Sequence, residues 1–303
     1  MPFMVSTQNF ENSLEALSAR VNAALEQWLP VNQPEVSCRL NEAVRYSALA
    51  GGKRIRPALC VMVCEGFGLH NDASLRAGCA FELIHTYSLI HDDLPAMDND
   101  DYRRGKPTNH KVFGEATAIL AGDSLLTLAF EWFATLADYG VSADKIIKII
   151  KIASLAAGHQ GMIGGQMLDI AYEKQGAGLQ ILESIHRQKT GALIIAPAKT
   201  GAILADASPE DLQIIEAFSA RIGLLFQIVD DILDVEGDLD SLGKMPGRDV
   251  VMGKSTYPSL LGLDGARNYA DQIFHAAING LNGLSRPQPL LADMASFILN
   301  RKK

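Results

Sequence analysis

Cysteine, surplus positive charge and long uncharged apolar runs are scarce in this sequence, and each scarcity argues against a class of protein. The four cysteines form no C-x-x-C pair and no disulfide framework, so we interpret them as small core side chains. No uncharged apolar run reaches the roughly 18 residues that a membrane span needs, so we expect no stable membrane insertion. The first residues lack a basic segment followed by an apolar stretch, which predicts no secretory signal and a cytoplasmic location.

Charge and composition narrow the class further. The formal net charge of −8 argues against a general nucleic-acid-binding surface, although a local basic pocket for a small anion remains possible. Of the 303 residues, 48% are hydrophobic and 20% are charged, which suits a globular protein with a large core.

Strand-like alternation is almost absent, and helical periodicity fills most of the chain. Ser208 before Pro209, with acids in the next turn, predicts a capped helix start. We find no linker or repeat, so we expect a single all-α domain over residues 1–303 with about ten mostly long helices. The clearest helical segments are residues 13–29, 75–93, 116–140, 143–171 and 208–237.

Five aspartates crowd into the ten residues that follow one of these apolar helices. They are Asp92, Asp93, Asp98, Asp100 and Asp101. An ideal helix would point Asp92 and Asp98 in different directions, but Pro95 should end the helix near Leu94. Asp98 can then fold back toward Asp92. Carboxylate-rich sites with only oxygen ligands suit Mg²⁺, which commonly bridges protein carboxylates to a substrate phosphate.

A second acidic cluster lies in "FQIVDDILDV". Asp230 and Asp234 are four residues apart and share one helix face, with Gln227 about one turn earlier. A solvated helix end is the alternative interpretation, but apolar residues surround these acids on both sides. Carboxylates in such surroundings need a balancing cation. Two acidic clusters that face each other could hold Mg²⁺ ions, and the ions could hold a diphosphate.

Basic side chains should line the same cavity to take up the remaining phosphate charge. Each candidate alone is more often a solvated surface charge, and only their occurrence beside two acidic clusters favours a binding role. The candidates are Lys53, Arg54, Arg56, Arg103, Arg104, Lys189 beside Thr190, Lys244, Arg248 and Lys254.

Several blocks, taken in order, resemble one family. "DDLPAMD" has the D-D-x4-D form of its first aspartate-rich motif, and "DDILD" has the D-D-x-x-D form of its second. "GGKRIRP", "GMIGGQMLDI", "RQKTGALI" and "GKMPGRDVVMGKSTYP" match further blocks. Over about residues 40–303 the chain resembles trans-isoprenyl diphosphate synthases, most closely the bacterial farnesyl diphosphate synthase type. This resemblance implies an all-α fold around a deep central cavity, the isoprenoid synthase fold, and a homodimer.

The resemblance also implies a reaction. An allylic diphosphate ionises with help from Mg²⁺, and three Mg²⁺ ions are implied per active site. The double bond of isopentenyl diphosphate then attacks the carbocation, and loss of a proton completes the step. The implied Mg²⁺ ligands are Asp92, Asp98 and Asp230, with Asp93 and Asp234 acting through water or hydrogen bonds. The implied contacts of the allylic diphosphate are Arg103, Lys189, Lys244 and Lys254, while Thr190 and Gln227 offer oxygen dipoles to the cation. The implied isopentenyl diphosphate ligands are Lys53, Arg56, His85 and Arg104.

The resemblance also bears on product length. Tyr87 lies five residues before Asp92, where an aromatic residue is typical of C15-forming bacterial enzymes, and Ser88 lies four residues before. We therefore expect farnesyl diphosphate as the product, with geranylgeranyl diphosphate as the alternative. A non-catalytic subunit of a synthase should lack acids in one motif, and a terpene cyclase needs no isopentenyl site. Both are weaker interpretations of this sequence.

Overall fold

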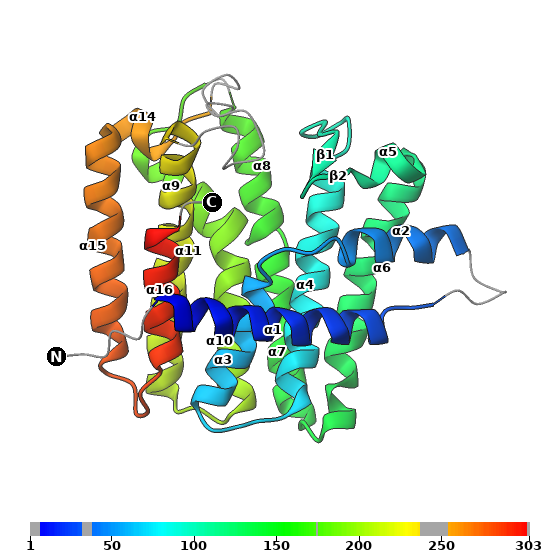
Figure 1. Cartoon of the computed structure of the whole chain (residues 1–303), viewed down its shortest axis with the longest axis horizontal. Helices are drawn as coiled ribbons and strands as arrows, with labels where there is room; N and C mark the ends of the chain where they lie inside the picture. The colour runs from blue at the N-terminus through cyan, green and yellow to red at the C-terminus, as the bar shows by residue number, and fades with distance from the viewer. Residues whose placement is uncertain (1–6, 32–37, 174, 237–253, 302–303) are drawn as a thin grey trace. The chain divides into compact units, whose positions relative to one another are not determined.

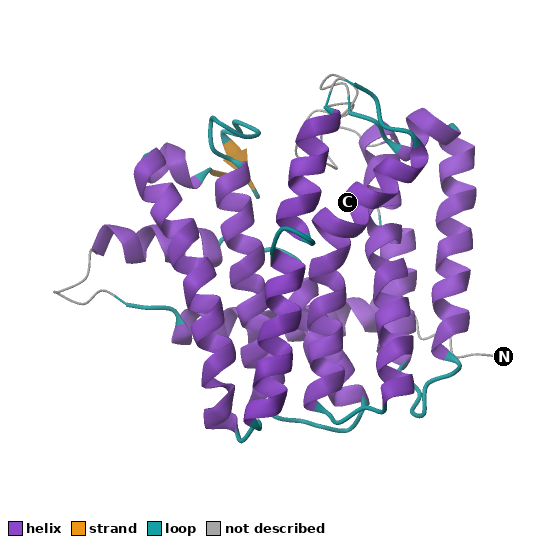
Figure 2. Cartoon of the chain, turned by 180° about the vertical axis from the view of Figure 1, so that it is seen from behind, coloured by secondary structure: helices purple, strands orange, loops and turns teal. Residues whose placement is uncertain are grey.

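The computed structural model describes residues 7–31, 38–173, 175–236 and 254–301. Most of these residues are helical, and the strands among them are β1 (Tyr102–Arg103) and β2 (Lys106–Pro107), as Figure 2 shows. The two strands pair antiparallel, with Tyr102 opposite Pro107. The all-α prediction is therefore confirmed.

The chain forms two compact units. We call residues 12–61 and 70–150 the hairpin unit, and residues 1–11, 62–69 and 151–303 the α11 unit. The expectation of a single domain stays a prediction. The helices of the hairpin unit are α1 (Thr7–Trp28), α2 (Cys38–Ala48), α3 (Ile55–Gly66), α4 (Asp72–Asp92), α5 (Asn109–Phe113), α6 (Glu115–Ala134), the 3₁₀ helix η1 (Thr135–Tyr139) and α7 (Ala143–Ala157). α1 begins, and α3 and α7 end, in the α11 unit.

Helix α4 forms the core of the hairpin unit. Most of its residues are buried on every face, which is why it shows almost no amphipathic pattern in the sequence. It packs along α6, and the rings of Phe81 and Phe133 meet edge to face at 4.9 Å. Because α4 is fixed in this way, the acidic segment at its carboxyl end starts from a rigid base.

Helix α11 (Pro209–Glu236) plays the same part in the α11 unit. The Ser208 hydroxyl accepts a hydrogen bond from the backbone N–H of Asp211 at 3.0 Å, so the predicted cap is confirmed. α11 packs against α10, α15 and α16, whose labels can be followed in Figure 1. The other elements of this unit are α8 (Met162–Tyr172), α9 (Leu179–His186), the π-helical turn η2 (Arg187–Gly191), α10 (Ala192–Leu204), α14 (Tyr257–Leu261), α15 (Leu263–Leu281) and α16 (Pro289–Asn300).

One expected helix is broken. Residues 143–171 read as a single long helix, whereas α7 ends at Ala157 and α8 begins at Met162. The connection contains Gly158 and Gly161, and glycine is a poor helix former. The described part of the chain contains more helices than the expected number of about ten. This break and the five-residue helices α5 and α14 contribute to the difference.

Three helical stretches among the described residues are long and apolar enough to cross a membrane by length and composition alone. They are residues 115–139, 143–172 and 209–236, and 39%, 39% and 50% of their most apolar windows are buried inside the protein. The expectation of no stable membrane insertion thus stays a prediction.

Candidate active site

The first acidic cluster lies where α4 ends in the hairpin unit. α4 ends at Asp92, and the backbone N–H of Asp98 donates to the carbonyl oxygen of Asp92 at 2.8 Å. Pro95 lies in the turn between them, where it disfavours continuation of the helix. The prediction that Asp98 folds back toward Asp92 is therefore confirmed.

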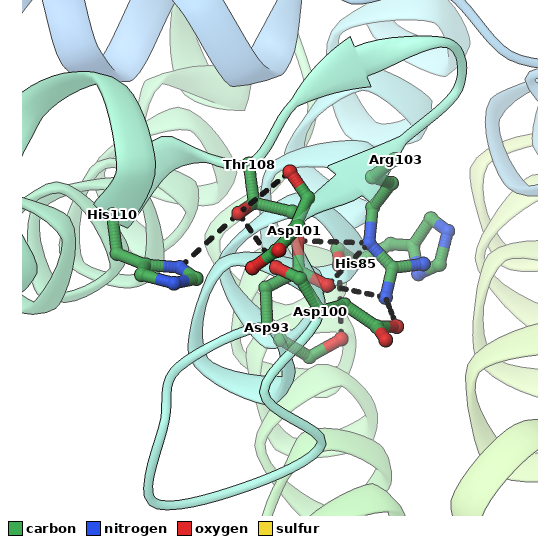
Figure 3. Close-up of polar contacts among 8 residues, drawn as sticks. His85, Asp93, Asp100, Asp101, Arg103, Thr108 and His110 are labelled. Carbon is green, nitrogen blue, oxygen red and sulfur yellow. Dashed lines mark hydrogen bonds and ion pairs between the residues drawn. The ribbon is translucent and has the colours of Figure 1, made fainter.

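Asp93 is tied to the β-hairpin instead. Its carboxylate is 3% exposed and accepts hydrogen bonds from Arg103 Nε at 2.7 Å and from Arg103 Nη2 at 2.5 Å, as drawn in Figure 3. Burial raises the pKa of Asp93, and the bond from Arg103 opposes the rise. Burial in turn disfavours the charge of Arg103, but the bond to Asp93 and the nearby Asp100 leave its pKa raised. The hairpin thus carries a fixed cation beside the acids.

The loop before α3 is organised around an inward-pointing arginine. Arg54 has a positive φ of 49°, and its side chain is fully buried. It donates to Glu82 Oε1 at 2.6 Å, to the carbonyl oxygen of Ala48 at 2.7 Å and to Asn22 Oδ1 at 2.9 Å. Arg54 is therefore a structural residue, and of the basic residues at positions 53, 54 and 56 only Lys53 in the loop and Arg56 at the start of α3 remain as binding candidates.

The hairpin reaches this basic loop through Arg104. The Arg104 guanidinium donates to the carbonyl oxygen of Gly51 and lies over Gly52, where a Cβ would come within 2.7 Å of its central carbon. Gly52 also has a φ of +122°, which strongly favours glycine. Arg104 is thus held beside the loop that carries Lys53 and leads into Arg56 at the start of α3. Arg104 and Gly51 are 53 residues apart in the sequence, so local sequence patterns alone do not show that they meet.

His85 lies among these arginines. Burial, followed by the charges of Arg56, Arg104, Arg103 and Arg54, holds the pKa of His85 well below its ordinary value, so the imidazole is neutral at pH 7. Burial likewise lowers the pKa of Arg56 to about 10, which leaves it charged at pH 7. Several arginine side chains around a neutral imidazole form a suitable setting for an anion. The structure therefore brings the four predicted isopentenyl diphosphate ligands into the same unit.

Tyr87 and Ser88 lie one to two turns below Asp92 on α4. The Tyr87 side chain is buried, its ring meets that of His91 edge to face at 5.7 Å, and its hydroxyl has no hydrogen-bond partner among the described residues. Gly122 of α6 makes room for His91, because a Cβ there would overlap the imidazole. The Ser88 hydroxyl donates to the carbonyl oxygen of His85 at 2.9 Å. Tyr87 is thus the bulky member of the pair.

The second acidic cluster occupies the last turns of α11. Asp230 is partly exposed, whereas Asp231 and Asp234 are 6% exposed each. Asp231 Oδ2 accepts a hydrogen bond from the backbone N–H of Tyr257 at 2.9 Å, and so helps to fix the start of α14. Asp230 Oδ1 accepts a hydrogen bond from Arg301 Nη2 at 2.5 Å. The acids of this cluster therefore have different surroundings, which their spacing alone does not show.

A cavity beside α11 collects most of the predicted allylic residues. Lys189, Thr190, Gln227 and Lys254 all line it, together with Asp169, and Thr190 Oγ1 donates to Gln227 Oε1 at 2.5 Å. Lys189 Nζ lies 2.6 Å from Asp169 Oδ2, and Lys254 Nζ lies 3.9 Å from the same oxygen. Burial works against its charge, but Lys189, Lys254 and His186 lower the pKa of Asp169. One carboxylate thus holds two ammonium groups at the cavity wall.

The π-helical turn η2 explains how two adjacent residues line one cavity. Successive residues of an α-helix point about 100° apart, and the wider turn over residues 187–191 alters this local geometry. Glycines pack against the turn: a Cβ on Gly165 of α8 would overlap the backbone of Lys189, and a Cβ on Gly223 of α11 would come within 3.0 Å of Gly191. These close contacts fix the positions of Lys189 and Thr190.

His186 lies at the end of α9 and lines the same cavity. Its ring packs 5.5 Å from that of Tyr257, and its Nδ1 is buried without a hydrogen-bond partner in the described part of the chain. Burial, aided by the charge of Lys189 and opposed by Asp169, lowers the pKa of His186 to about 4. The ring is therefore neutral at pH 7.

The residues present fit a hard divalent cation. No three histidine, cysteine or acidic side chains form a complete metal-binding group within the described residues. Each acidic cluster nevertheless offers carboxylate oxygens, and Asp234 Oδ1 is buried without a hydrogen-bond partner there, which is costly for a carboxylate. Mg²⁺ usually takes only one or two carboxylates and completes its shell with water and phosphate oxygens. Asp92 and Asp98 of the hairpin unit could contribute to holding such an ion once a diphosphate is present, and so, separately, could Asp230 of the α11 unit.

The sequence interpretation missed two functional candidates, and two of the basic residues that it named lie outside the described residues. Asp169 stands in the block "GMIGGQMLDI", but a single acid on an apolar helix carries no spacing signal. Arg301 gives no signal either, since it lies among basic residues near the end of the sequence. Lys244 and Arg248, which the sequence analysis named, lie outside the described residues. The roles assigned to the individual site residues stay predictions.

Known proteins resemble the chain over nearly its whole length. It is 46% identical over 287 residues to geranylgeranyl pyrophosphate synthase 7, chloroplastic, of Arabidopsis thaliana, covering 93% of this chain and 81% of that protein. It is 45% identical over 292 residues to farnesyl diphosphate synthase of Bacillus subtilis (strain 168), covering 96% of this chain and 99% of that protein.

Solved structures give the same picture. An FPP/GFPP synthase from Zymomonas mobilis, in its apo form, matches with a TM-score of 0.86 and 37% identity over 97% of this chain and all (100%) of that one. A geranyltransferase from Helicobacter pylori, complexed with magnesium and isoprenyl diphosphate, matches with a TM-score of 0.82 and 32% identity over 99% of this chain and 98% of that one. Residues 37–283 match the model of the protein family described as "Polyprenyl synthetase". The resemblance stated from the aspartate-rich motifs is confirmed, and the chain belongs to the polyprenyl synthetase family.

Proposed function

We propose that this prenyltransferase condenses isopentenyl diphosphate with dimethylallyl and then geranyl diphosphate to give (E,E)-farnesyl diphosphate. The observation that supports the proposal most is the cavity of the α11 unit, whose wall brings Lys189, Thr190, Gln227 and Lys254 together. The wall also carries the Asp169 carboxylate, which pairs with both ammonium groups and fixes their positions. Two ammonium groups held in this way, beside two neutral oxygen-bearing side chains, suit a diphosphate attached to an allylic chain.

The residues of the chain divide the work of ionisation. Lys189, Lys254 and Arg103 take up negative charge on the departing diphosphate as the allylic C–O bond breaks. When bound by Asp92, Asp98 and Asp230, Mg²⁺ supplies further electrostatic stabilisation of that leaving group. Thr190 and Gln227 direct oxygen dipoles toward the positive charge that develops on the allylic carbon.

The basic loop positions the second substrate. Lys53, Arg56 and Arg104 bind the diphosphate of isopentenyl diphosphate, and neutral His85 donates one hydrogen bond to it. The isopentenyl double bond then attacks the allylic carbocation and forms the new C–C bond. A proton leaves the adjacent carbon for an oxygen of the released diphosphate, which restores a double bond and balances the charge.

Tyr87 supports a C15 product. A growing chain that runs down α4 from Asp92 meets the buried phenol ring about one turn below. Geranylgeranyl diphosphate is the second candidate, because relatives named for either product are almost equally similar to this chain. A homodimer in the cytoplasm, with three Mg²⁺ ions per active site, completes the proposal.

Product analysis with single variants tests the proposal. The purified protein is incubated with Mg²⁺, isopentenyl diphosphate and each allylic primer in turn, and the products are sized by mass. Asp92→Ala or Asp230→Ala should lower turnover by several orders of magnitude, since each removes a proposed ligand of the Mg²⁺ that stabilises the charge of the leaving diphosphate. The matched control is Asp101→Ala, which removes a largely exposed acid from the first cluster and should leave turnover nearly unchanged. Near-normal turnover of both Asp92→Ala and Asp230→Ala would refute the metal assignment.

A further inference from the structure

Arg301 makes an unusual set of contacts with the second acidic cluster. Its Nη2 donates to Asp230 Oδ1 at 2.5 Å and to the carbonyl oxygen of Phe226 at 2.7 Å. The guanidinium carbon lies 3.9 Å from the centre of the Phe226 ring, a cation–π distance. The Arg301 side chain is only 5% exposed, whereas that of Asp230 is 42% exposed. A nearly buried cation therefore covers one side of an accessible carboxylate.

The position of Arg301 is set by the helix that precedes it. α16 packs against α11 and buries Leu291, Met294 and Ile298. Arg301 follows the end of this helix directly. Phe226 and Asp230 are four residues apart and therefore lie on one face of α11, where a single guanidinium can reach both. The packing of α16 against α11 therefore positions Arg301 beside Asp230.

We propose that Arg301 is a built-in counter-ion of Asp230 that weakens the binding of a divalent cation there until a diphosphate arrives. The inference rests on the proposed function, because it takes Asp230 as a metal ligand. A divalent cation bound to Asp230 lies close to the positive charge of Arg301 in a poorly solvated place. The repulsion between the two charges makes the free energy of cation binding less favourable. A bound diphosphate brings negative charge that offsets this repulsion. Metal and diphosphate therefore favour each other's binding.

The test measures metal binding directly rather than catalysis. Mn²⁺ replaces Mg²⁺, and its free concentration is followed by electron paramagnetic resonance during titration of the wild-type protein and of Arg301→Gln. Without diphosphate, the variant should bind Mn²⁺ at least about fivefold more tightly, the effect of removing one close positive charge. Inorganic pyrophosphate should tighten Mn²⁺ binding more in the wild type than in the variant, after correction with protein-free samples.

Control variants separate this contact from general charge and from loss of folding. Arg267→Gln removes the same charge near the same helix, where Arg267 pairs with Glu236, and should leave Mn²⁺ affinity unchanged. Arg301→Lys retains the charge and should stay close to the wild type. Arg301→Met keeps an apolar stem against Phe226, and it should bind Mn²⁺ more tightly than the wild type even if Arg301→Gln folds poorly.

The outcomes distinguish the inference from the proposed function. Equal or weaker Mn²⁺ binding by both Arg301→Gln and Arg301→Met would overturn the inference while the wild type still forms product. Unchanged Mn²⁺ binding by Asp230→Asn in the wild-type background, together with no product from the wild type, would instead overturn the proposed function.

Discussion

The buried pair of Arg54 and Glu82 allows a stability prediction with a worked magnitude. Their side chains are 0% and 2% exposed, and the guanidinium also binds Asn22 and the carbonyl oxygen of Ala48. Arg54→Met would leave the Glu82 carboxylate buried beside apolar atoms and one backbone acceptor without its donor. Removing one partner of a buried pair costs about 3–5 kcal/mol. We expect a loss of unfolding free energy of that size.

The assay is chemical unfolding in urea, followed by far-ultraviolet circular dichroism. Arg54→Met/Glu82→Leu should recover much of the loss, because an apolar pair leaves no unpaired charge. Arg187→Met is the matched surface control: Arg187 pairs with Glu183 on an exposed helix face, and its loss should cost less than about 1 kcal/mol. A cost below about 1 kcal/mol for Arg54→Met would refute the reasoning. A weaker affinity for isopentenyl diphosphate should accompany the loss, because Arg54 lies between Lys53 and the first turn of α3, which carries Arg56.

Two further predictions concern product length and pH. Tyr87→Ala should lengthen the main product by at least one isoprene unit, as sized by mass, because it removes the buried ring on α4; an unchanged product profile would show that another residue sets the length. The pKa of His186 is about 4 in the folded protein and about 6.5 in the unfolded chain, so unfolding takes up a proton between these values. Its share of stability is fully present above pH 6.5 and falls by about 3 kcal/mol toward pH 4. His186→Asn should flatten that part of a stability-against-pH curve, while the exposed His275→Asn should not; equal curves for both variants would contradict the assignment.

Local rules were sufficient for the parts of the site that depend on neighbouring residues. The turn at Pro95 that returns Asp98 to Asp92, and the cap of α11 at Ser208, follow from proline and serine chemistry within a few positions. The all-α class follows from periodicity in the same way.

Partners far apart in the chain could not be found by such rules. Asp169 and Lys189 are separated by 20 residues, and Asp230 and Arg301 by 71. A lone charge on an apolar helix gives the same pattern whether it meets a partner or solvent. The inward direction of Arg54 depends likewise on a positive φ and on Glu82 of another helix. Spacing and resemblance therefore predicted candidate residues, whose roles stay predictions, but not the long-range contacts that hold them.

The π-helical turn over residues 187–191 constrains the number of residues in this part of the chain more than it constrains their identity. Deletion of one residue there would allow a regular α-helix, yet it would rotate every later side chain of α10 by about 100° and shift it by about 1.5 Å. Substitutions at the outer positions leave that register intact. Any graft of this segment into another helical scaffold must therefore carry the additional residue and the glycines that accommodate it.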